Sequence, residues 1–326
     1  MPRPGLARPG LARPGLARPD GLNAAIRAPL PMRGGVGPSR VYLPEGDWVS
    51  LLDFLLERFP HVPPDVLRAR LARGDIVDAA GHAQRPSSPY TARRWLWYYR
   101  EVPAEAPVPF DLPVLFRDDL LVAVDKPHFL ASIPGGRYLQ ETALTRLRRD
   151  LDLPELSPLH RLDRDTAGVL LFCLRPESRG AYQTLFQTHK VEKEYEALAP
   201  WRAELSLPLL RRSRLRQRTG HFTMQEVPGE PNSATHIELM AEERGLGRYR
   251  LRPHTGRKHQ LRVHMSGLGV PIRNDGFYPE LLPYAEPDDF SRPLQLLARA
   301  IEFTDPLTGA RRRFESRRRL QWPPDA

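Results

Sequence analysis

The stretch that decides the fold is PLHRLDRDTAGVLLFCL, residues 158–174. Its second half, residues 169–174, is an uninterrupted apolar run of strand length, which is typical of a strand buried on both faces. Its first half is rich in charge and places Asp163 between Arg161 and Arg164. The stretch therefore predicts a charged loop that enters a buried strand and can turn a carboxylate toward a cleft.

Asp163 has two interpretations when these residues are taken alone. Asp163 and Asp165 can pair with the neighbouring arginines or cap a turn, as most aspartates in a basic protein do. Alternatively, Asp163 is a functional carboxylate, because adjacent cations favour the charged form of an acid. The rest of the chain has to decide between these two interpretations.

A second informative stretch is VEKEYEAL, residues 191–198. Its glutamates alternate with other residues, as in a strand that has one solvated face, so Tyr195 is expected to point inward. A buried tyrosine of this kind is more often a core residue with a satisfied hydroxyl than a catalytic one.

The third stretch, TGRKHQLRVHM at residues 255–265, carries a helical stripe. Leu261, Met265 and Leu268 predict a helix that docks on the sheet and ends at Gly269.

Three histidines in and beside this stretch suggest a metal site, which we weighed against their spacing. His254, His259 and His264 are five residues apart. That spacing puts neighbours about 140° apart on a helix and on opposite faces of a strand, whereas chelating pairs usually lie at i, i+4. We therefore expect no metal site.

Together, the three stretches resemble the RluA branch of RNA pseudouridine synthases. Residues 160–168 are similar to its signature His-Arg-Leu-Asp-Arg-x-Thr-Ser-Gly, and Tyr195 ends a Lys-x-Tyr. Residues 256–264 are similar to its pattern Gly-Arg-x-His-Gln-(Ile/Leu)-Arg-x-His. Three positions depart from the family, with Ser, Thr and Gly replaced by Ala167, Lys258 and Asn274. The resemblance covers most of residues 114–305.

The resemblance implies an isomerase that converts uridine to pseudouridine without a cofactor or a metal ion. Asp163 would be the catalytic carboxylate, which either attacks C1′ or removes the 2′ hydrogen; both routes stay open. Tyr195 would stack on the base and move a proton, and Arg262 would form a salt bridge with Asp163. The other motif residues would bind substrate RNA: His160, Arg161, Arg164, Thr166, Lys193, Arg257, His259 and Gln260.

The expected fold class is α+β, with the mixed, mainly antiparallel sheet of the pseudouridine synthase fold and flanking helices, preceded by a small S4-like α/β module. We assign residues 1–40 to a disordered basic tail and residues 41–101 to the degenerate S4-like module. The proline-rich residues 102–113 are the expected linker. The catalytic domain is expected to span residues 114–326.

The expected S4-like module contains two amphipathic segments. Residues 48–59 have helical apolar spacing, and residues 65–72 form a second predicted helix with Arg68, Arg70 and Arg73 on its basic side. An S4-like RNA-binding role and an ordinary helical cap are equally compatible with this pattern.

The tail before this module repeats PGLAR three times and holds seven arginines against one aspartate. It is too poor in apolar residues to form a core. We interpret it as a disordered basic arm that touches phosphates weakly; a translated repeat or a misplaced start codon explains it nearly as well.

Composition narrows the class of partner. The chain has 326 residues and a net charge of +10, which favours a polyanion, although an arginine-rich composition also explains the charge. Cys173 is the single cysteine, so an internal disulfide and a multi-thiolate zinc site are excluded, as suits a reducing cytoplasm. No apolar run approaches the roughly 20 residues that span a bilayer.

We therefore expect a cytoplasmic enzyme, monomeric as in the family, that acts on structured RNA: large-subunit ribosomal RNA, transfer RNA or both. The competing hypothesis is a non-catalytic RNA-binding protein that acts in ribosome assembly. The simultaneous presence of Asp163, Tyr195 and Arg262 favours the enzyme, because a pure binder does not need all three. Arginines at 211–218 and 311–319 are RNA contacts or a solvated surface, and the sequence does not choose.

Overall fold

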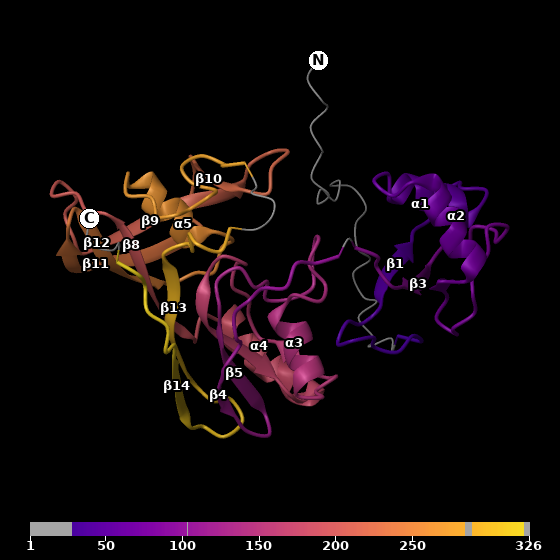
Figure 1. The fold of residues 1–326 in the computed structure, drawn as a ribbon, viewed down its shortest axis with the longest axis horizontal. Coiled ribbons are helices and arrows are strands. Elements are labelled where there is room, and N and C mark those ends of the chain that lie inside the picture. The colour runs from indigo at the N-terminus through magenta and orange to yellow at the C-terminus, as the bar shows by residue number, and fades with distance from the viewer. Residues whose placement is uncertain (1–27, 103, 284–288, 323–326) are drawn as a thin grey trace, which may run out of the picture. The chain divides into compact units, whose positions relative to one another are not determined.

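The computed structural model describes residues 28–102, 104–283 and 289–322, and the chain divides into two compact units, Met1–Pro103 and Ala104–Ala326 (Figure 1). Most of the expected basic tail lies in residues 1–27, outside the described residues. The first strand begins at Ser39, within the range assigned to that tail. In the part of the chain that the structure describes, no helix is both long and apolar enough to cross a membrane.

The first unit is a three-stranded antiparallel sheet with two helices. The strands pair in the order β1-β3-β2, and the elements are β1 (Ser39–Leu43), α1 (Leu51–Arg58), α2 (Pro64–Arg73), β2 (Ile76–Val77) and β3 (Arg94–Tyr98). Helix α1 begins at a capping box, in which Ser50 accepts a hydrogen bond from the backbone N–H of Asp53. Helix α2 ends at Gly74, whose φ of 78° suits glycine. The expected basic face of α2 is corrected at Arg70, which is buried and ion-paired with Glu101.

The second unit is built on an eleven-stranded sheet. Its main path runs β10-β9-β11-β12-β8-β13-β7-β5-β4, with β14 on β13 and β6 on β7. The strands are β4 (Val114–Arg117), β5 (Leu121–Lys126), β6 (Ser157–Pro158), β7 (Ala167–Cys173), β8 (Glu192–Pro200), β9 (Leu209–Gln217), β10 (Met224–Val227), β11 (Ser233–Glu243), β12 (Leu246–Pro253), β13 (Leu296–Thr304) and β14 (Arg311–Glu315). Strand β13 pairs parallel with β7, and the other pairings are antiparallel. The mixed, mainly antiparallel sheet that the sequence predicts is therefore confirmed.

Strands β5 and β7 lie near the β4 edge of the sheet, and every residue of both is buried. Their alternate side chains face opposite layers. On one face, Leu170 packs in a cluster with Leu144 of α3 (Ala143–Asp150). On the other face, Leu171 packs with Tyr182 of α4 (Arg179–Gln187), which follows the short 3₁₀ helix η1 (Pro176–Ser178). The predicted strand buried on both faces is thus β7.

Two local features position the loop that carries Asp163 and the elements beside it. Gly168 has a φ of 115°, and a Cβ there would collide with the Ala298 backbone, so glycine lets β7 lie beside β13. Helix α5 (Gln260–Gly267) lies against β9, β10 and β11, and its Leu261 and Met265 share a buried cluster with Leu251 of β12. The helix expected from the apolar stripe is confirmed.

Candidate active site

Asp163 lies in the loop between β6 and β7, and its side chain is 32% exposed. Two nitrogens near the start of α5 face its carboxylate. Arg262 Nη1 is 3.8 Å from Asp163 Oδ2, and His259 Nε2 is 3.9 Å from Asp163 Oδ1. The fold therefore brings together residues that are about a hundred positions apart in the sequence.

Arg262 is held chiefly by Asp275 rather than by Asp163. Its Nε and Nη2 donate to the two Asp275 oxygens at 2.8 and 2.5 Å, and both side chains are almost completely buried. Asp275 also accepts the backbone N–H groups of Phe277 and Tyr278. Arg262 Nη1 makes no hydrogen bond with any described residue. Arg262 therefore makes two salt bridges, and the one with Asp163 that the resemblance implies is the longer. The pairing with Asp275 orients Arg262 Nη1 toward Asp163.

His259 faces Asp163 as a neutral ring. Burial and the positive charges of Arg262 and Lys258 lower the pKa of His259 to about 3. The Tyr278 hydroxyl accepts the Met224 N–H at 2.7 Å, which leaves its proton to be donated to His259 Nδ1 at 2.8 Å. The remaining ring proton is therefore assigned to Nε2, the nitrogen that points toward Asp163.

Tyr195 lies on β8, paired with Leu251 and Ala298 on the neighbouring strands. Its ring is half-buried and packs against two hydrophobic clusters. Burial and the negative charge of Asp163 raise the pKa of the Tyr195 hydroxyl. The residue therefore presents an aromatic ring and a protonated phenol beside the carboxylate.

Several of the predicted RNA-binding residues have partners within the protein. Gln260 accepts from Thr255 Oγ1 and the Arg257 backbone N–H, and it donates to Ala234 O and Thr235 Oγ1. All four hydrogen-bonding positions of its amide are thus used in fixing the loop before α5.

His160 and Thr166 also serve the loop that carries Asp163. His160 Nε2 accepts the Leu171 backbone N–H at 3.2 Å, and its ring stacks on Phe186. Burial and the charge of Lys193 lower the pKa of His160 to about 3. Thr166 is buried, and its backbone N–H donates to Asp163 O. These contacts account for both residues without an RNA ligand.

The four predicted cations differ in how open they are. Arg161 and Arg257 are exposed, and Arg257 donates to Asn232 O. Arg164 is ion-paired with Asp165 at 3.0 Å, and Lys193 Nζ lies 3.5 Å from Thr255 O. Arg161 is therefore the most accessible of these charges in the loop that carries Asp163.

The sequence assigned no role to Lys126, which contacts the backbone of the loop that carries Asp163. Its ammonium is fully buried and donates to the carbonyls of Pro127, Leu130 and Arg164 at 2.9, 2.7 and 3.1 Å. Desolvation lowers the pKa of Lys126 to about 7, against the attraction of Asp165 and Asp163. The sequence does contain a sign of this role, because Lys126 ends an apolar run that predicts a buried strand, and a buried cation needs hydrogen-bond partners.

Two of the three histidines considered as metal ligands, His259 and His264, have hydrogen-bond partners within the protein. Among the described residues, no group of three or more His, Cys, Asp or Glu side chains is arranged to hold a metal ion. His264 is hydrogen-bonded to Ser213, Ser233 and Thr235 inside the protein.

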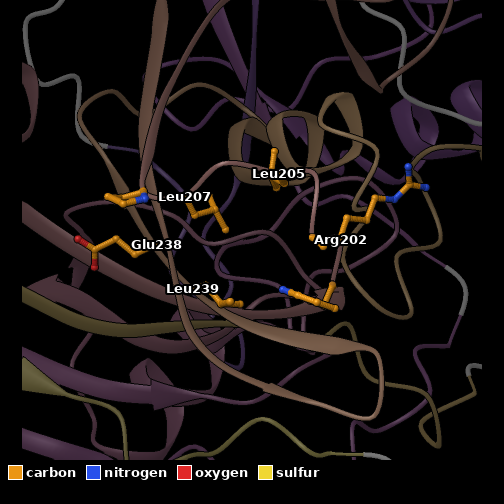
Figure 2. Close-up of a pocket in the computed structure, with 8 residues that line it drawn as sticks. Arg202, Leu205, Leu207, Glu238 and Leu239 are labelled. Atoms are coloured by element: carbon orange, nitrogen blue, oxygen red, sulfur yellow. The ribbon is translucent and has the colours of Figure 1, made fainter.

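One hollow of the second unit, about 480 Å³ in volume, lies away from these residues. Figure 2 shows part of its lining, Arg202, Leu205, Leu207, Glu238 and Leu239. None of the residues that line it belongs to the three motifs, so it is not the candidate active site.

Comparison with known proteins shows which sequences this chain is similar to. A sequence profile described as RNA pseudouridylate synthase matches residues 120–267. The dual-specificity RNA pseudouridine synthase RluA of Salmonella typhi is 33% identical over 208 residues, which cover 61% of this chain and 89% of that protein. An uncharacterized RNA pseudouridine synthase of Synechocystis is 29% identical over 236 residues, 70% of this chain and 79% of that protein.

A solved structure shares the fold. Human RNA Pseudouridylate Synthase Domain Containing 1 has a TM-score of 0.52 and 23% identity, covering 64% of this chain and 85% of its own. Fold, site and sequence together define an RNA-modifying isomerase. The chain belongs to the RluA family of RNA pseudouridine synthases.

Proposed function

We propose that this enzyme isomerises specific uridines in large-subunit ribosomal RNA, in transfer RNA or in both, with Asp163 as its catalytic carboxylate. The observation that carries the proposal is the setting of Asp163, an accessible carboxylate faced by Arg262 Nη1 and His259 Nε2. The name of the Salmonella relative, a dual-specificity enzyme, supports keeping both RNA classes as candidates.

The reaction breaks the N1–C1′ bond of uridine, turns the base and joins C5 to C1′. The C5 hydrogen leaves as a proton and N1 gains one, so atoms and electrons balance without an oxidant or reductant. A uridine inside a stem has to be flipped out first, which costs roughly a few kcal/mol. Asp163 would then attack C1′ or remove the 2′ hydrogen.

The neighbouring residues have roles that fit either route. Tyr195 would stack on the extruded base, because its ring is flat, half-buried and beside the carboxylate. Arg262 and the neutral ring of His259 would hold Asp163 in position, and the positive charge of Arg262 would oppose the negative charge of Asp163 after water is excluded. Arg161, exposed two residues before Asp163, would contact the RNA backbone.

The first unit is proposed as an S4-like RNA-binding module, in a monomeric cytoplasmic enzyme. Arg68, exposed on α2, supports contact with phosphates, whereas the burial of Arg70 narrows the available basic surface. Arg68→Gln should weaken RNA binding if the unit is a module, and it should have no effect if the unit is a cap.

The experiment that tests the function is pseudouridine mapping by carbodiimide modification and primer extension, on ribosomal and transfer RNA from cells with and without the gene. We expect the deletion to lose one or a few sites. Wild-type protein should restore them and Asp163→Asn should not. If neither RNA loses a site, the non-catalytic RNA-binding protein becomes the better account.

A further inference from the structure

Strand β9 divides its charged side chains between two faces. On the inner face, Arg211 is ion-paired with Glu226, Ser213 is hydrogen-bonded to His264, and Leu215 is buried. These contacts tie the strand to β10 and α5. Every polar group on the inner face therefore has a structural partner.

The outer face of β9 carries Arg212, Arg214 and Arg216, which we call the arginine row. All three are exposed, and none makes an ion pair or a hydrogen bond with a residue that the structure describes. Alternate residues along a strand are about 6.6–6.8 Å apart, so the row is a line of evenly spaced positive charges. Exposure alone does not distinguish it from an ordinary solvated face.

Other arginines on the same face of the sheet are paired. Strand register places Arg248, Arg250 and Arg252 of β12 on this face. Arg248 pairs with Glu196, and Arg250 and Arg252 both pair with Glu194 and Glu238. Glutamates thus neutralise the positive charges of the β12 arginines, whereas no described carboxylate pairs with the arginine row on β9.

The strand that bears the row leads toward the active site. The turn between β9 and β10 carries Phe222, whose ring lies 4.8 Å from Phe277 and 6.2 Å from His259. Lys258 Nζ donates to Phe222 O, and Phe277 in turn lies against the guanidinium of Arg262. In Figure 1, β9 and β10 lie beside α5, the helix that supplies Arg262.

A glycine supports one member of the row. The β10–β11 turn contains Gly229 with a φ of 126°, and a Cβ there would lie 3.0 Å from Arg214 Cδ. Both the stem and the guanidinium of Arg214 therefore lie close over the turn, because Arg214 Nη1 would be 3.3 Å from that Cβ, and the residue as a whole is exposed.

The arginine row lacks carboxylate partners among the described residues, its charges are evenly spaced, and its strand leads into the turn beside His259. We therefore propose that the arginine row binds the phosphate backbone of the substrate RNA, beside the nucleotide that enters the site. The inference rests on the proposed function, in which RNA occupies that site. An RNA that places a uridine at Asp163 passes the tip of the β9–β10 hairpin, and its flanking phosphates then run along the outer face of β9.

The test is R212Q/R214Q/R216Q in the full chain, measured by fluorescence anisotropy over a series of KCl concentrations. The probes are an unmodified large-subunit ribosomal RNA transcript and, separately, unmodified transfer RNA. The matched control is R117Q/R175Q/R292Q, which removes the same charge from three exposed positions outside the arginines at 211–218 and 311–319. A thermal melt checks that both variants are folded.

We expect the row variant to lose at least about tenfold in affinity and to raise KM. Each phosphate contact contributes about 0.7 to 0.9 to the slope of log affinity against log salt, so the slope should fall by about 2 to 3. The control should keep the wild-type slope. An unchanged slope in the row variant, or an equal fall in the control, overturns the proposal.

Product formation by the wild-type enzyme separates this inference from the proposed function. If the enzyme makes pseudouridine and the row variant binds like wild type, the row proposal fails alone. If the row variant loses the salt dependence while the wild-type enzyme makes no pseudouridine in either RNA, the function fails and the row remains an RNA-binding surface.

Discussion

Charged side chains around the loop that carries Asp163 differ in burial and pairing from those on the outer face of β9. Lys126, Arg262 and Asp275 are buried, and each has its partners within the protein. The arginine row is exposed and has none among the described residues. Burying an ion costs several kcal/mol unless it is paired, whereas an exposed arginine costs little to leave unpaired. Buried charges therefore hold the site in shape, and exposed ones are available to a ligand.

Asp163 is intermediate between these two groups in both exposure and pairing. Its carboxylate is 32% exposed, and its two nearest cationic or polar nitrogens lie at 3.8 and 3.9 Å rather than at hydrogen-bond distance. That arrangement fits a group that has to be aimed by the protein and still reach a substrate.

The largest effect on stability is expected from removing a buried charge. Asp275→Asn should lower the free energy of unfolding by about 3–5 kcal/mol, because it leaves Arg262 buried without its counter-ion. Activity should fall with it, since Arg262 loses its anchor. The matched control is Asp150→Asn, which breaks the exposed pair with Arg149 and should cost less than about 1 kcal/mol in urea denaturation. Equal losses in the two variants would contradict the comparison.

Tyr195 should separate stacking from proton transfer. Tyr195→Leu should weaken RNA binding by about 1–3 kcal/mol, the usual range for loss of one base–aromatic stack. Tyr195→Phe should bind RNA normally and lose turnover only. Equilibrium binding and single-turnover rates on the same RNA give both numbers. Normal binding by the leucine variant would argue against a stacked base.

The buried histidines should make the fold sensitive to acid. Burial lowers the pKa of His264 to about 4, and those of His128, His160 and His259 are lowered as well. Between about pH 6.5 and pH 4 the unfolded chain then binds more protons than the native one, so stability falls as the pH is lowered. His264 should account for up to about 1.4 kcal/mol per pH unit.

Urea unfolding at pH 7, 6 and 5 measures this dependence. His264→Gln should have a shallower slope than wild type, because one of the four titrating groups has been removed. An identical slope would show that His264 does not titrate in this window.

The smallest effect on stability is expected in the arginine row. Arg214→Gln should change the free energy of unfolding by less than about 0.5 kcal/mol, as is usual for surface substitutions. The variant for comparison is Arg248→Gln, which removes one of the arginines paired with the buried Glu196. Its free energy of unfolding should be clearly lower than that of Arg214→Gln. If the two variants unfold at the same urea concentration, the paired Arg248 contributes no more to stability than the unpaired Arg214, which contradicts the comparison.

Much of this arrangement follows from sequence patterns of short range. The apolar run at 169–174 predicts β7, and the stripe of Leu261 and Met265 predicts α5, because both depend on periodicity along one segment. The motifs also identify Asp163, Tyr195 and Arg262 as candidate site residues from the sequence alone.

Contacts between distant segments could not be predicted in this way. The Arg262–Asp275 pair depends on the path of a loop, and Lys126 bonds a carbonyl 38 positions away. Arg70 was predicted on a basic helical face and is buried instead, because its side chain turns inward to reach the Tyr99 carbonyl. Periodicity fixes the face of a helix, but it does not fix where a long side chain finds its partner.

The most direct test of the central claim compares Asp163→Asn with Asp165→Asn. Both variants remove one carboxylate from the same loop, but Asp165 is ion-paired with Arg164. The assay is release of the C5 label from RNA that carries tritium at C5 of uridine, because that hydrogen leaves during isomerisation. We predict that Asp163→Asn loses at least about 10³-fold in rate and that Asp165→Asn retains most of its activity. Near-normal release by Asp163→Asn would contradict the assignment of the catalytic carboxylate.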